Sequence, residues 1–99
     1  MADCLVTCIN KPHHLSPHEH ITHIGNSAGG WRITIASAVN RISSGTDSFY
    51  TQNAQGGRVE IAVVREAGKQ PYLRTHADGQ WNDNLLAQQE CGPNCRIVD

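Results

Sequence analysis

Apolar residues between Thr34 and Gly45 recur at every third and fourth position, with polar residues between them. This spacing places the apolar side chains on one face of an α-helix. Thr34 is suited to cap the N-terminus, because its hydroxyl can accept a hydrogen bond from a free backbone N–H, and Gly45 is suited to the left-handed conformation that ends a helix. The sequence therefore predicts one amphipathic helix, whose apolar face consists of Ile35, Ala38, Val39 and Ile42.

Elsewhere the apolar pattern alternates with a period of two, which is typical of β-strands. The predicted strands are residues 5–9, 20–24, 31–33, 48–52, 58–65 and 71–75. Turn residues separate the second strand from the third and the fourth from the fifth, so each of these pairs is expected to form a hairpin. From His76 onward the chain is polar, which predicts a loop with at most one helical turn at residues 83–87. Together these elements predict an α+β fold, in which one amphipathic helix packs across a small, mostly antiparallel sheet.

The chain has 99 residues, which is enough for one domain and too few for two. We therefore predict a single domain over residues 1–99, in which residues 92–99 form a tail that can be disordered. The formal net charge is −1, so no strong positive field exists to attract nucleic acid or an anionic membrane. The sequence shows no basic leader and no long apolar run, so we expect a cytoplasmic location.

The four cysteines and six histidines are the residues best able to bind a metal ion. Cys4 and Cys8 near one end of the chain, and Cys91 and Cys95 near the other, have spacings within the range of structural zinc ligands. In a continuous strand, however, Cys4 and Cys8 would lie roughly 13 Å apart, so both could bind one ion only if that segment curls. A mixed zinc site is easier to form, with Cys8 from the first strand, His18 and His20 from the next segment, and Cys91 from the C-terminal region. The alternative is that the cysteines are buried as small apolar residues and the histidines are exposed. In a cytoplasmic protein a disulfide is less expected than free thiols or metal ligands.

A second candidate site is a cluster of polar residues after the last predicted strand, where loops on a rigid scaffold commonly bind ligands. Arg74 offers paired N–H donors to a phosphate or carboxylate, and Trp81 offers a ring face for stacking. The alternative is structural, because Asp and Asn side chains also stabilise turns, and Arg74 can pair with a nearby carboxylate. The predicted ligand-binding residues are Arg74, Thr75, Asp78, Trp81, Asp83 and Asn84.

Short segments spread along the chain also resemble a known family. They are residues 21–24, Trp31 before the helix, Gly45 before Phe49, residues 71–75 with Asp78, and residues 83–86. Together they resemble DUF3892, a family of small bacterial and phage domains of unknown function, over most of the chain. The resemblance implies a shared fold and no particular activity. Cys4 and the tail containing Cys95 fall outside the family pattern, so the resemblance does not support a site that needs them.

These patterns favour a small non-enzymatic binding module that recognises a small polar or anionic ligand, or a protein partner, through the polar loop. The second hypothesis is a zinc-stabilised accessory domain. An enzyme is disfavoured, because no Ser–His–Asp spacing, carboxylate pair or nucleophile elbow is evident. No nucleic-acid or membrane partner is expected.

Overall fold

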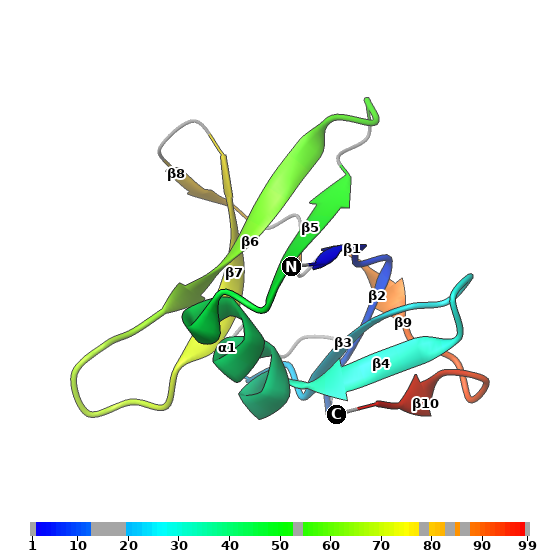
Figure 1. The fold of residues 1–99 in the computed structure, drawn as a ribbon, viewed down its shortest axis with the longest axis horizontal. Helices are drawn as coiled ribbons and strands as arrows, with labels where there is room; N and C mark the ends of the chain where they lie inside the picture. The colour runs from blue at the N-terminus through cyan, green and yellow to red at the C-terminus, as the bar shows by residue number, and fades with distance from the viewer. Residues whose placement is uncertain are drawn as a thin grey trace.

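Two five-stranded sheets and one helix make up the described part of the chain (Figure 1). The computed structural model describes residues 2–12, 20–52, 55–77, 80–82, 85 and 88–98. Sheet A contains, in spatial order, β1 (Ala2–Leu5), β5 (Asp47–Gln52), β6 (Arg58–Val64), β7 (Tyr72–Ala77) and β8 (Gln80–Asn82). Sheet B contains, in spatial order, β10 (Arg96–Ile97), β4 (Trp31–Thr34), β3 (His23–Asn26), β2 (Cys8–Asn10) and β9 (Gln89–Glu90).

The predicted helix is confirmed as α1 (Ile35–Ser44). Its N-cap is Thr34, whose hydroxyl accepts a hydrogen bond from the Ser37 backbone N–H at 3.2 Å. Gly45 ends the helix with φ at 76°, a left-handed conformation that glycine adopts without steric cost. Ala38 is fully buried, and the three larger residues of the predicted face are half-buried and pack against the core. No helix among the described residues is long and apolar enough to cross a membrane.

The N-terminal segment passes from one sheet to the other at Val6 and Thr7. The Val6 backbone N–H donates to the Tyr50 carbonyl of sheet A at 2.7 Å, and the Thr7 N–H donates to the Gly25 carbonyl of sheet B at 2.8 Å. The predicted strand 5–9 is therefore divided into the end of β1 and the start of β2. Val6 is fully buried in the main core, which explains why the segment between the two strands contains an apolar residue.

The α+β class is confirmed, but the prediction of one mostly antiparallel sheet is wrong. The expected hairpins are present, since β3 pairs with β4 and β5 pairs with β6 in antiparallel orientation. Three pairs are parallel, namely β1 with β5, β2 with β9, and β4 with β10. Each parallel pair joins segments that are distant in sequence. Local alternation predicts that a segment is a strand, but it does not predict a partner across such a distance.

Two further segments differ from the prediction. Strand β7 continues through Ala77 and pairs with β8, so residues 76–77 and 80–82 belong to a hairpin where a polar loop was expected. The C-terminal residues 92–98 are also part of the fold, because Arg96–Ile97 forms β10 at the edge of sheet B. The predicted helical turn at residues 83–87 lies almost entirely outside the described residues.

The main core lies between the inner faces of the two sheets. Ile9, Ile24 and Ile33 are register partners across sheet B, and all three are buried. Sheet A contributes residues such as Phe49 and Leu73, and the ring centroids of Phe49 and Trp31 lie 6.5 Å apart across the two sheets. Because strand residues alternate, the neighbours of these core residues must point outward.

We expect Ala38→Asp to reduce the free energy of unfolding by more than ~3 kcal/mol, because it buries an unpaired charge under the helix. Thermal melting measures the effect. Ala36→Asp is the matched control, since Ala36 is an exposed residue of the same helix. Equal melting temperatures for the two variants would mean that the buried face of α1 is assigned incorrectly.

Candidate functional site

Three cysteine sulfurs meet on the outer face of sheet B. Ile9 faces the main core, so the adjacent Cys8 points to the opposite face of the sheet. Cys8 and Cys91 form a disulfide, and the sulfurs of Cys8, Cys91 and Cys95 all lie within 4.8 Å of one another. Their side chains are 0%, 8% and 2% exposed, respectively, and they form a small core of their own. The disulfide differs from the sequence-based expectation of free thiols or metal ligands.

Residues 91–95, here called the strap, bring the second and third cysteines onto this face. The strap connects β9 and β10, which lie at opposite edges of sheet B (Figure 1). It is attached at one end by the Cys91 N–H, which donates to the Ile9 carbonyl at 3.0 Å, and at the other by the Arg96 N–H, which donates to the Gly30 carbonyl at 2.9 Å. Between them, the Cys95 N–H donates to the Gly92 carbonyl at 3.1 Å. This hydrogen bond closes a turn that directs the chain back toward Cys91.

Arg32 lies on the same face of sheet B as Cys8. Register places Cys8 opposite Gly25 and Gly25 opposite Arg32, so the three form one row across the sheet. Gly25 has no side chain, and a Cβ there would lie only 2.9 Å from the Arg32 Cβ. The Arg32 guanidinium donates to the Asn10 side-chain oxygen at 2.8 Å, and the Asn10 amide donates to the Cys91 carbonyl at 3.4 Å. Hydrogen bonds through the Asn10 side chain therefore link the positively charged Arg32 to the strap.

Of the four predicted metal ligands, the structure brings together Cys8 and Cys91. His20 is exposed and is not part of the sulfur cluster, and His18 lies outside the described residues. The third member of the cluster is Cys95, which has a zinc-ligand spacing from Cys91 but was left out of the predicted mixed site. A sequence signal for it exists, because Pro93 and Asn94 favour the central positions of a turn that returns the chain toward Cys91.

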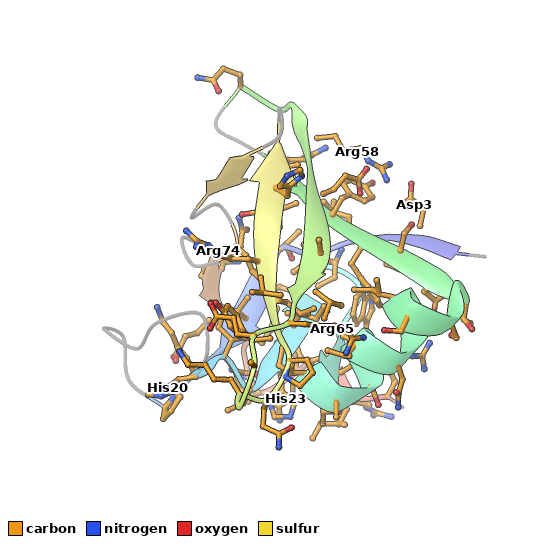
Figure 2. The ribbon with its side chains drawn as sticks, turned by 90° about the vertical axis from the view of Figure 1, so that its left-hand side faces the viewer. Asp3, His20, His23, Arg58, Arg65 and Arg74 are labelled. Atoms are coloured by element: carbon orange, nitrogen blue, oxygen red, sulfur yellow. A yellow bond between two sulfur atoms is a disulfide. The ribbon has the colours of Figure 1, made fainter. Side chains whose placement is uncertain are left out.

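Of the six predicted ligand-binding residues, Arg74 and Trp81 occupy positions on the outer face of sheet A. Arg74 is half-buried on β7, and Figure 2 shows it projecting from the side of this strand. Register pairs His76 with Trp81 of β8, so Arg74 and His76 share a face with position 81. Thr75 points inward: it is fully buried, and its hydroxyl accepts a hydrogen bond from the Leu85 N–H at 3.1 Å. Asp78, Asp83 and Asn84 lie outside the described residues.

A network of charges occupies another part of this outer face (Figure 2). The Arg58 guanidinium donates to both carboxylate oxygens of Asp3 and to Glu60, and it lies 4.1 Å from the centre of the Tyr50 ring. The hydrogen bond from Arg58, assisted by one from Ser48, holds the pKa of Asp3 below its ordinary value. Because two carboxylates already bind Arg58, its charge attracts an anionic ligand less strongly than that of an arginine without carboxylate partners.

A cavity of about 200 Å³ lies between the two sheets. Burial, followed by the carboxylates of Asp47 and Asp3, raises the pKa of the Cys4 thiol in its wall, so this cysteine stays protonated and weakly nucleophilic. The cavity is smaller than typical small-molecule sites, which occupy about 300–1,000 Å³, and it carries no functional assignment. Its lining residues are Cys4, Trp31, Ile33, Arg41, Asp47, Phe49 and Val98.

Acid destabilisation is expected to depend on Asp3. Its folded-state pKa is depressed, so its contribution to stability is fully present above the unfolded pKa and is lost as the pH falls through the folded pKa. Asp3→Asn should remove this part of the stability loss below about pH 4, measured as the urea midpoint against pH. Glu66→Gln, a change in an exposed loop, is the control and should retain the wild-type profile.

Reduction in the presence of a chelator should lower the free energy of unfolding by about 2–4 kcal/mol. The Cys8–Cys91 disulfide joins residues separated by 83 positions, so breaking it releases a long loop in the unfolded chain. Denaturant unfolding with and without reductant measures the difference. A Cys4→Ser variant should respond as the wild type does, whereas Cys8→Ser should no longer respond; an unchanged wild-type midpoint would contradict the expectation.

The comparisons with known proteins agree with the resemblance seen in the sequence. No curated protein and no solved structure matches the chain. A family model described as "Protein of unknown function (DUF3892)" matches residues 5–87, which is most of the 99-residue chain. The match includes α1 and the strands from β2 to β8, and it ends before the strap and its two cysteines. The chain belongs to the DUF3892 family.

Proposed function

We propose that this domain is a small non-enzymatic binding module, and that its binding surface is the outer face of sheet A at β7 and β8. The observation that carries the proposal is strand register. Leu73 and Thr75 are buried, so Arg74 and His76, which alternate with them, face outward. Trp81 pairs with His76 on the neighbouring strand. Three residue types that bind planar or anionic groups therefore occupy adjacent positions of one sheet face.

The chemistry of these residues favours an anionic or planar polar ligand, such as a nucleotide, a sugar phosphate or a carboxylate. A guanidinium binds phosphate or carboxylate oxygens through paired N–H donors, and indole and imidazole rings stack on planar groups. Arg74 and position 81 are diagonal neighbours across the strand pair, a separation of about 7–8 Å that long side chains can span. Thr75 is omitted from the proposed surface because it belongs to the core. The other candidates from the sequence, Asp78, Asp83 and Asn84, lie outside the described residues.

Replacing Arg74 with lysine should remove most of the ligand-induced stabilisation. A thermal-shift screen of nucleotides, sugar phosphates and carboxylates at physiological salt identifies compounds that raise the melting temperature of the wild type. Arg74→Lys keeps the charge and most of the aliphatic stem but loses the paired donors, so it should retain stability and lose most of the shift. Arg65→Ala, a change at an exposed arginine after β6, is the control and should keep the full shift.

Two results would contradict this proposal. One is the absence of any shift across the screen, which would favour a protein partner over a small ligand. The other is a shift of equal size in the wild type and in Arg74→Lys.

A zinc-stabilised accessory domain is the second candidate function, and the cluster of Cys8, Cys91 and Cys95 favours it. In the cytoplasmic location that we propose, cellular reductants keep most thiols free, so these sulfurs would be available to a metal. Cys8 and Cys91 then act as ligands, with His18 or His20 contributing nitrogen as the sequence suggested. Metal binding would replace the disulfide as the link between the strap and β2. Metal analysis of the reduced protein separates this candidate from a domain held only by the disulfide.

A further inference from the structure

We propose that Cys8, Cys91 and Cys95 together bind one zinc ion when their thiols are reduced, and that a peroxide expels this ion by joining Cys8 to Cys91. The inference rests on the second candidate function and deepens it by naming a third sulfur ligand and a reaction. It concerns the outer face of sheet B and is independent of the proposed binding surface on sheet A.

The spacing of the sulfurs fits a zinc site. Zinc–sulfur bonds of about 2.3 Å place the sulfurs of a tetrahedral site roughly 3.8 Å apart. The three sulfurs of the cluster already lie within 4.8 Å of one another, so loading requires only that the disulfide opens and the sulfurs adjust slightly. The cluster is buried, which excludes competing water from the thiolate ligands. Three sulfur ligands leave the fourth zinc position for a ligand of another type.

Backbone hydrogen bonds on both sides of Cys95, and not a covalent bond of its own, place it in the cluster. The turn closed by the Cys95 N–H and the Gly92 carbonyl returns the chain toward Cys91. On the far side of Cys95, the Arg96 N–H is bound to the Gly30 carbonyl. Cys95 is therefore held from both sides, beside a disulfide to which it is not bonded. A buried free thiol in this position is a preorganised third ligand.

The charge of the loaded site can also be accommodated. A divalent zinc ion bound by three thiolates leaves one net negative charge, which is costly to bury without a nearby cation. Arg32 lies in the same row of sheet B as Cys8, with only Gly25 between them. Its Nε is buried and has no hydrogen-bond partner among the described residues. The guanidinium can therefore offset the charge of the site without giving up a hydrogen bond at this atom.

The oxidation step balances with hydrogen peroxide as the oxidant. The thiolates of Cys8 and Cys91 give up two electrons in total and form the S–S bond, while their bonds to zinc break. Hydrogen peroxide takes up the two electrons and two protons from solvent, its O–O bond breaks, and two water molecules form. Zinc leaves as the divalent ion, and the Cys95 thiolate takes a proton. The product is the disulfide and the free Cys95 thiol that the structure contains.

Both states of the site hold the strap against β2. In the reduced state the zinc ion joins Cys91 and Cys95 to Cys8, and in the oxidised state the disulfide joins Cys91 to Cys8 directly. Oxidation therefore releases a metal ion and a thiol while the domain stays folded. Only the reduced, metal-free protein lacks a covalent or metal link between the strap and β2.

The test measures zinc in three proteins after reduction, loading with zinc and removal of excess metal. We expect one zinc ion per wild-type chain and the same in Cys4→Ser, whose cysteine lies on sheet A. Cys95→Ser should bind zinc at least tenfold more weakly. The oxidised form of Cys95→Ser tests whether this variant folds. The Cys8–Cys91 disulfide does not involve residue 95, so the oxidised variant should form it and melt cooperatively. Hydrogen peroxide should then release the wild-type zinc, and peptide mapping should find Cys8 joined to Cys91.

Each contrary result has a separate meaning. A reduced wild type that binds no zinc would overturn this inference together with the zinc-stabilised candidate. If Cys95→Ser binds zinc as tightly as the wild type, while a His18→Ala/His20→Ala variant does not, the zinc candidate survives in its mixed form and the role of Cys95 is wrong. Retention of zinc after peroxide treatment, or a disulfide that involves Cys95, would overturn the proposed reaction.

Discussion

The passage of the chain through Val6 and Thr7 determines how the two sheets are joined. Val6 is bonded to sheet A and Thr7 to sheet B, and the buried Val6 side chain lies in the core between them. These two residues also determine which way the nearby cysteines point. Cys4 pairs with Phe49 at the inner side of sheet A, whereas Cys8 faces the outer side of sheet B. Two cysteines that are close in sequence therefore have different chemical roles.

The two outer faces carry different chemistry because the inner faces are occupied by the core. On sheet A, the residues that alternate with buried Leu73 and Thr75 are an arginine and a histidine, beside a strand that contains tryptophan. On sheet B, the residue next to buried Ile9 is a cysteine, and the strap covers it with two more. A face that carries polar side chains suits a polar ligand, whereas a covered sulfur cluster suits a metal ion or a disulfide.

The strap on sheet B affects the fold more than the polar residues on the outer face of sheet A do. It connects β9 and β10, the two edge strands of sheet B. Strand β9 pairs in parallel with β2, and β10 pairs in parallel with β4. Both edge strands are only two residues long, so their few backbone hydrogen bonds provide little stability alone. The link between Cys8 and the strap supplies the missing constraint. The Cys8–Cys91 disulfide thus helps to hold the two edge strands on sheet B.

The sequence by itself determined the local elements of this protein. The spacing of apolar residues, with Thr34 and Gly45 as caps, was sufficient to predict α1, and alternation with turn residues was sufficient for the β3–β4 and β5–β6 hairpins. These features depend on neighbours within a few residues. Arg74 was also recognised as a candidate, because its side-chain chemistry is visible without a structure.

Only the tertiary structure decided which distant segments meet. The parallel pairing of β1 with β5 and of β9 with β2 depends on long-range packing, and local alternation contains no information about it. The same reason explains the sites: Thr75 was predicted to bind a ligand but is buried opposite Ile61, and Cys95 was left out of the predicted mixed zinc site but lies beside Cys8. A residue's type shows what chemistry it can perform, whereas its neighbours in space determine whether that chemistry has the partners it requires.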